Sequence, residues 1–139
     1  MSQESETRNV DKLREVREAL LRLHKVLLNY QREVWERGNG RIENSYELLN
    51  LVLHDQKFAW LHYLSEFVVH IDESLSLDEV HTEEDVAGVL EQARFLIVPA
   101  EVGDSFQSNY FRALQNSPDV VLAHSEAVRA LGKRVADVH

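Results

Sequence analysis

The feature that most constrains this sequence is its scarcity of helix-breaking residues, with only two prolines and five glycines in 139 residues. Proline and glycine are the strongest local interruptions of regular structure, so long helices can form where both are missing. The first 37 residues contain neither, and their apolar residues recur at helical spacing. These apolar positions are Leu13, Val16, Leu20, Leu23, Leu27, Tyr30 and Val34. We therefore predict a first helix from Asn9, a suitable N-cap, to Arg37, just before the stop signal Gly38-Asn39-Gly40.

A second helical region begins near Asn44, where Glu47 follows three residues later in a pattern that resembles a capping box. Apolar residues then occupy positions 48, 49, 51, 52 and 53. His54-Asp55 interrupts them, and the aspartate could cap a second helical piece. Two alternatives are open: one helix that continues to Ser74, or two pieces separated by a kink or short break, which we favour.

The second half of the sequence contains three further helix signals. After a connection over residues 75–82, Thr82 precedes three acidic residues that suit a helix start. This helix should reach about Val98 and stop before a proline. A shorter helix is predicted over residues 104–115. Ser117-Pro118 then opens a final helix, with serine as the N-cap and proline at the first position, and its apolar stripe extends to Val135.

These signals together predict the fold class. No strand-length segment alternates between apolar and polar residues, so we expect an all-α protein. Four main helices of these lengths favour an antiparallel four-helix bundle, with residues 104–115 as an additional short helix. We expect residues 1–8 to be a disordered N-terminal tail and residues 9–139 to be a single helical-bundle domain.

Composition excludes several classes of function. Cysteine is absent, which removes disulfides, thiolate nucleophiles, Cys-type zinc sites and iron–sulfur clusters. The formal net charge is −9, with Lys and Arg spread among acidic residues, so nucleic acid and anionic lipid are poor partners. No stretch approaches the roughly 20 apolar residues of a membrane helix, and the N-terminal segment has no apolar signal-peptide region. We expect a cytoplasmic protein that binds neither membranes nor nucleic acid.

A row of polar residues, His62, Glu66 and His70, has the four-residue spacing of metal ligands on a helix. Successive helical residues rotate by about 100°, which places this row opposite the apolar face of residues 58–75. We therefore interpret it as a solvated face with weak pairing between neighbours. The alternative is a divalent metal site, because His62-x-x-x-Glu66 has the spacing of a hemerythrin-like element.

Two other histidines lie on apolar helix faces. His24 lies among leucines of the first helix, and His124 lies among valine and leucine residues of the last. The first and last helices of an up-down bundle are antiparallel neighbours, so their middles can face each other. With Gln31 from the His24 face and Tyr110 from the short helix, these histidines form a candidate ligand pocket. The simpler interpretation is two half-buried histidines, each hydrogen-bonded to a neighbour.

Several short segments carry a resemblance to known sequences. They are Leu23-His24-Lys25, Leu27-Leu28, Leu53-His54-Asp55, Phe58-Ala59-Trp60-Leu61, Leu64-Ser65, Ile71-Asp72 and Pro118-Asp119-Val120-Val121-Leu122-Ala123-His124. In these segments, which span most of its length, the chain resembles a bacterial family of small, all-helical cytoplasmic proteins of unassigned function. The resemblance implies a helical bundle in a bacterial cytoplasm, and it implies no activity, cofactor or catalytic residue.

The sequence contains no phosphate-binding glycine loop, nucleophile elbow or HExxH motif. We therefore favour a protein that is not an enzyme, has no cofactor, and acts as a homo-oligomer or through a protein partner. The surplus of apolar residues over 58–70 supports this expectation. The alternative is a bundle that binds a small ligand or a divalent metal, iron or zinc, through core histidines.

Overall fold

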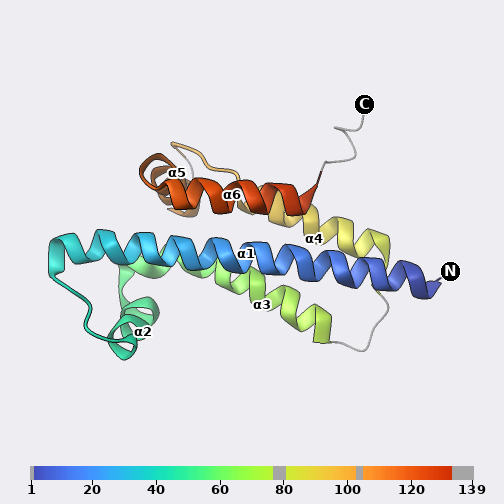
Figure 1. Cartoon of the computed structure of the whole chain (residues 1–139), viewed down its shortest axis with the longest axis horizontal. Coiled ribbons are helices and arrows are strands. Elements are labelled where there is room, and N and C mark those ends of the chain that lie inside the picture. Colours follow the sequence, from blue (N-terminus) through green and yellow to red (C-terminus); the bar gives the residue numbers. More distant parts are fainter. Residues whose placement is uncertain (1, 77–80, 103–104, 133–139) are drawn as a thin grey trace.

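The computed structural model describes residues 2–76, 81–102 and 105–132 (Figure 1). Over these ranges the protein is all helical, with six α-helices, one 3₁₀ helix and no strand. In chain order the elements are α1 (Ser2–Asn39), α2 (Ser45–His54), η1 (Gln56–Leu61), α3 (His62–Ser76), α4 (Glu83–Leu96), α5 (Ser105–Asn116) and α6 (Pro118–Leu131). The predicted all-α class is confirmed.

Helix α1 is longer than predicted at its N-terminus. It begins at Ser2, so the predicted start at Asn9 is wrong, and residues 2–8 of the expected tail are helical. Asn9 lies inside the helix and does not cap its start, and its amide nitrogen donates to the carbonyl oxygen of His81 at 2.6 Å. The C-terminal stop is where the glycines predict it, since Gly40 has a φ of 89° and its N–H donates to the Glu36 carbonyl oxygen.

The interruption at His54-Asp55 is confirmed, and the continuous helix is ruled out. Asp55 has extended backbone angles and is both the C-cap of α2 and the N-cap of η1. Its N–H donates to the Leu51 carbonyl oxygen and ends α2, while its carboxylate accepts from the Lys57 N–H at 2.8 Å and starts η1. Asparagine at position 44 caps α2, as predicted, by accepting the Glu47 N–H at 2.8 Å.

Local cap signals also set the later helices. Thr82 and Asp85 form a complete capping box, in which each side chain accepts the other residue's N–H at 3.1 Å. Ser117 accepts the Val120 N–H at 3.3 Å, with proline at the first helical position. Helix α6 ends at Leu131 before Gly132, and the predicted stripe position Val135 lies outside the described residues.

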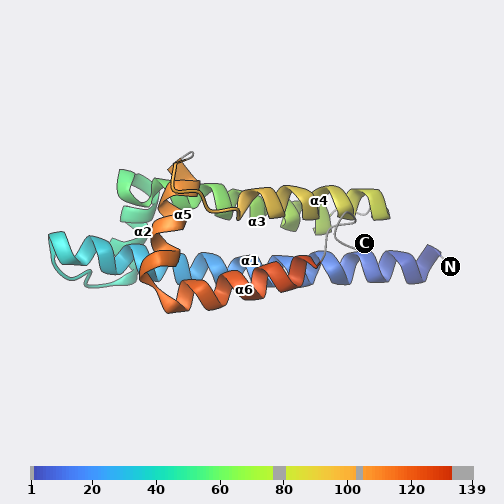
Figure 2. The same cartoon turned by 90° about the horizontal axis from the view of Figure 1, so that it is seen from above.

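Helix α1 is the element against which most others pack. It contacts α6, α3, η1 and α4. Figures 1 and 2 show that α3 and α6 run opposite to α1 while α4 runs parallel to it, and that α5 crosses at one end. Ion pairs add to these contacts: Arg17 pairs with Asp72 on α3, and Arg22 pairs with Glu126 on α6 at 3.1 Å. Helix α2 lies to one side and packs mainly on η1 (Figure 1).

The core lies between these helices and is made of aliphatic and aromatic side chains. The largest fully buried ones are Tyr110, Phe58, Phe106, Leu13, Leu20, Leu23, Leu27, Ile42, Leu61, Leu64, Ile71 and Val16. Five of the seven apolar positions predicted for the first helix are buried, whereas Tyr30 and Val34 are only partly covered. No helix in the described ranges has an apolar stretch that could cross a membrane.

The capping box of α4 should contribute measurably to stability. Thr82→Ala removes the hydroxyl that accepts the Asp85 N–H, so we expect the free energy of unfolding to fall by about 1 kcal/mol. Urea denaturation followed by circular dichroism measures this change. Thr82→Ser keeps the hydroxyl and is the matched control, and equal losses in both variants would contradict the capping role.

Candidate functional site

The structure brings together two of the predicted pocket residues, Tyr110 and His124. Tyr110 lies on α5 and is fully buried, and its hydroxyl hydrogen-bonds to Nδ1 of His124 on α6. The two rings meet edge to face, with centroids 5.5 Å apart. Burial raises the pKa of the Tyr110 phenol above its ordinary value of 10.0 and lowers the pKa of His124 below 6.5. Both groups are therefore neutral at physiological pH.

The direction of this hydrogen bond follows from the burial of Tyr110. If Nδ1 carried the proton, the tyrosine oxygen would accept it, and the hydroxyl hydrogen would need a second acceptor in a fully buried place. No other hydrogen bond of the Tyr110 hydroxyl is found among the described residues, and an unsatisfied buried O–H costs about 1–3 kcal/mol. Tyr110 therefore donates to Nδ1, and the neutral imidazole carries its proton on Nε2.

Gln31, the third predicted pocket residue, has a different partner. It is 6% exposed, and its side-chain oxygen accepts the indole N–H of Trp60 at 3.0 Å. Trp60 on η1 lies 5.7 Å from Phe106 between ring centroids, and Phe106 lies 5.4 Å from Tyr110. A continuous row of side chains in contact thus extends from Gln31 on α1 through three aromatic rings to His124 on α6.

His24, the fourth predicted residue, is near His62 rather than His124. Its imidazole is half-buried, and desolvation together with the charge of His62 lowers the pKa of His24. His62 is half-buried too, and its Nε2 lies 3.0 Å from the Val52 carbonyl oxygen. His24 and His124 line separate surface hollows, so the structure does not unite the four residues around one pocket.

The predicted polar row on α3 is not uniform. Glu66 and His70 are exposed, and His70 lies beside the ring of Phe67 at a centroid distance of 6.2 Å. His62 departs from this row, because it is turned toward α1 and the end of α2. Across the described residues, no three His, Asp or Glu side chains gather closely enough to hold a metal ion. The metal site proposed for His62, Glu66 and His70 has no support in this geometry.

A hollow of about 280 Å³ lies beside His124, between α6 and the end of α4. Its walls are mostly apolar, and its two charged or titratable members are His124 and Arg94. The full lining is Arg94, Ile97, Val98, Pro99, His124, Val128, Leu131 and Gly132. The imidazole of His124 thus has one nitrogen held by Tyr110 and borders an apolar hollow on the surface.

Helix α2 presents a second unusual feature, an apolar face that is exposed. None of its ten residues is buried. Leu48, Leu51 and Val52 are partly covered by the core, but Tyr46, Leu49 and Leu53 are 81%, 55% and 55% exposed. These last three residues, here called the α2 outer face, are spaced by three and four positions and so lie on one side of the helix.

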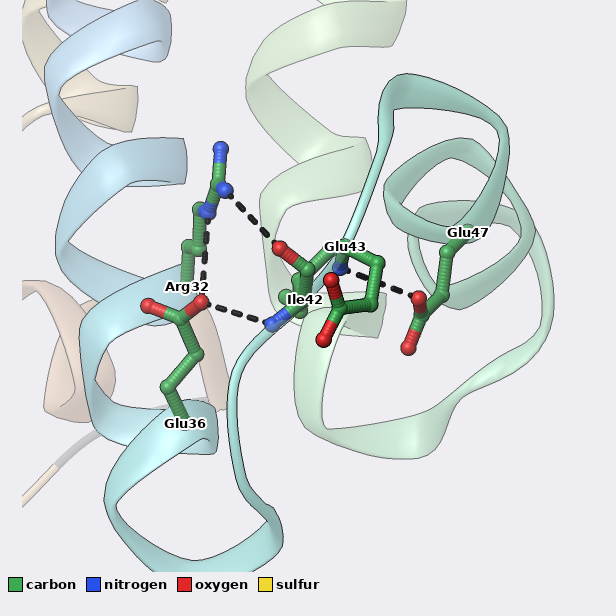
Figure 3. A network of polar contacts seen from close by, with 5 residues as sticks. All are labelled: Arg32, Glu36, Ile42, Glu43 and Glu47. Carbon is green, nitrogen blue, oxygen red and sulfur yellow. Dashed lines mark hydrogen bonds and ion pairs between the residues drawn. The ribbon is translucent and has the colours of Figure 1, made fainter.

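The segment before α2 is attached to α1 by a small polar network (Figure 3). Glu36 on α1 accepts the N–H of Ile42 at 2.8 Å, and the Arg32 guanidinium donates to the Ile42 carbonyl oxygen at 3.3 Å. Arg32 and Glu36 also pair with each other at 3.7 Å. Glu47 accepts the N–H of Glu43 at 3.1 Å. With the Ile42 side chain 1% exposed, this network fixes where α2 begins.

Sequence reasoning assigned the apolar surplus to residues 58–70 and missed the α2 outer face. The sequence did contain a signal for this face. The segment Tyr46–Leu53 has apolar residues on both sides of a helix, and a single packing contact can cover only one of these sides. The hollow beside His124 was also missed, since Arg94 and Val98 are far from His124 in the sequence.

No protein-family model matches this sequence, and no match was found among curated proteins or solved structures. The resemblance to a bacterial family of small helical proteins therefore stays a prediction. The two features of the structure that bear on function are the α2 outer face and the hollow beside His124.

The half-buried histidines His24 and His124 should make the folded state sensitive to acid. The pKa values of His24 and His124 lie below the ordinary value of 6.5, so the unfolded chain binds more protons. Their contribution to stability is present above about pH 6.5 and is lost as the pH falls through the folded-state pKa values. We expect the free energy of unfolding, measured by urea titration, to decrease from pH 7.5 to pH 5.

Replacing both histidines provides the check on this pH dependence. The double variant His24→Gln/His124→Gln should show a shallower decrease than the wild type over the same range, whereas His70→Gln, at an exposed position, should keep the wild-type slope. Equal slopes in all three proteins would contradict the assignment.

The polar network should hold α2 in place. Glu36→Ala removes the acceptor of the Ile42 N–H and the ion-pair partner of Arg32, and we expect a loss of about 1 kcal/mol in stability with faster amide hydrogen exchange over residues 42–54. Mass spectrometry of the exchanged peptides measures this. The control is Glu33→Ala at an exposed position of the same helix, and exchange that matches this control would exclude the role of Glu36.

Proposed function

We propose that this protein is a cytoplasmic, non-enzymatic binding protein, an antiparallel four-helix bundle of α1, α3, α4 and α6 that presents helix α2 to a protein partner. The observation that carries the proposal is the α2 outer face, where Tyr46, Leu49 and Leu53 are at least half exposed. A helix that lies on its partner's surface uses anchors at positions i, i+3, i+4 and i+7, and the outer face supplies i, i+3 and i+7.

The size of the outer face favours a groove as its binding site. An aromatic side chain buries about 150–250 Å² on binding, so three side chains offer less than the roughly 800 Å² per partner of a stable flat interface. Pairing of α2 with the same helix of a second copy is such a flat contact. A groove in a partner also encloses the sides of the helix, and thereby reaches the required area.

Charge favours a basic partner over a second copy. The chain has a net charge of −9, and two copies approaching each other repel. Glu43 precedes α2, Glu47 lies in its first turn, and Asp55 follows its last residue, so the two ends of α2 carry acidic groups. The fitting partner is therefore a protein with an apolar groove whose rim carries Lys or Arg side chains.

Site-specific photo-crosslinking tests this proposal. A benzophenone amino acid at position 46 should crosslink, in the cells that express the protein, to apolar residues of one partner flanked by Lys or Arg, as mapped by mass spectrometry. The same probe at position 95 is the control, because Phe95 is 75% exposed on a different helix. Crosslinks only to a second copy, or identical crosslinks from both positions, would overturn the proposal.

The purified partner then provides a quantitative check. Leu49→Asp should weaken its binding by at least about tenfold, since hot-spot anchors contribute 2 kcal/mol or more. Phe95→Asp should leave the affinity unchanged, and a peptide of residues 43–56 should compete with the full chain. Equal affinities of the two aspartate variants would exclude the outer face as the binding surface.

A further inference from the structure

We propose that the hollow beside His124 binds a small apolar molecule that ends in a carbonyl-type acceptor, a carboxylate or an amide. This site is independent of the α2 outer face, because its lining comes from α4, the segment after it and α6. The proposal depends on three features: the walls, the single oriented donor of His124 and the engagement of Arg94.

The walls suit the body of such a molecule. Five of the eight lining residues have apolar side chains, namely Ile97, Val98, Pro99, Val128 and Leu131. The volume of about 280 Å³ is close to the lower end of the roughly 300–1,000 Å³ of ligand pockets, and far above the space of a single water. The hollow is therefore sized for a short aliphatic chain or one ring.

His124 supplies the polar group. Tyr110 occupies Nδ1 as a donor, so the proton of the imidazole is on Nε2, and the ring can offer a ligand one N–H. An N–H donor selects a ligand with an acceptor oxygen and rejects an ammonium head group, which has donors only. Because the Tyr110 hydroxyl is buried and has only His124 as a hydrogen-bond partner among the described residues, this tautomer is set before any ligand arrives. Tyr110 acts as the positioning residue.

Arg94 is part of the wall of the hollow, and its guanidinium is engaged by neighbouring protein groups instead of by the ligand. Its Nη2 donates to the carbonyl oxygens of Leu131 and Gly132 at 2.8 and 3.2 Å, and its Nη1 pairs with Glu91 at 3.4 Å. The guanidinium thus fixes the C-terminal end of α6 against α4. Since Glu91 offsets its charge, the hollow can accept a carboxylate or a neutral amide, which share the acceptor that His124 recognises.

Nuclear magnetic resonance titration tests the site with three probes of one chain length: hexanoate, hexanamide and hexylammonium. Hexanoate or hexanamide should shift the His124 imidazole signals and the methyl signals of Ile97, Val98, Val128 and Leu131 to saturation. Hexylammonium should not. Binding of hexanoate alone identifies a carboxylate ligand, and binding of hexanamide alone identifies a neutral one. No saturable shift with either, or equal binding of hexylammonium, would overturn the proposal.

Two variants locate the binding. Val128→Trp fills the hollow from a half-exposed position and should weaken binding at least tenfold, whereas Leu122→Trp, at an exposed position elsewhere on α6, should not change it. Tyr110→Phe should also weaken binding, and the ¹⁵N shifts of His124 should report a mixture of tautomers. If Tyr110→Phe does not fold, Val128→Trp alone tests the site. Unchanged affinity in Val128→Trp would show that the probes bind outside the hollow, and would overturn the proposal.

Discussion

The burial of one apolar stripe along α1 is the constraint on which the rest of the structure depends. Leu13, Leu20, Leu23 and Leu27 are almost completely removed from water, and each buried side chain of this kind contributes about 1.5–3 kcal/mol by the hydrophobic effect. No single neighbour can cover such a long stripe, so α3, α4 and α6 each take part of it. The other helices are positioned by the length and straightness of this one.

Polar groups inside this core are few, and each has a specific partner. Within the described residues, no buried side-chain nitrogen or oxygen lacks a hydrogen bond. Gln31 is held by Trp60, and Tyr110 is held by His124. Because an unpaired polar group in an apolar interior is costly, these pairs fix how η1 meets α1 and how α5 meets α6. The same pairing that stabilises the fold leaves His124 with one oriented donor at the surface.

The sequence predicted the helices well where the signal is local. Asn44, Asp55, Thr82 and Ser117 all cap helices as expected, because a cap bonds to residues two or three positions away. Asn9 has the same chemistry but reaches the carbonyl oxygen of His81, 72 residues later, and no local pattern reveals that contact.

The candidate sites were harder to predict, because they depend on long-range packing. His62, Glu66 and His70 lie on the one helix α3, so their relative spacing is as the sequence predicts. The start of α3 is covered by other elements, however, and His62 therefore lies against Val52 and His24 while Glu66 and His70 are exposed. Tyr110 and His124 were correctly grouped. The hydrogen bond between Gln31 and Trp60 joins two segments that are far apart in the sequence, and the spacing of residues does not predict that they meet.

The lack of buried residues in α2 has a consequence for how this protein can diverge. Substitutions in a packed core reduce folding stability through the cavities and clashes that they create. The side chains of Tyr46, Leu49 and Leu53 are exposed, so their substitution changes folding stability little. Mutation can therefore alter the chemistry of that face while the scaffold keeps its shape. A change of partner would therefore require new side chains at these three positions and little adjustment of the buried residues of α1.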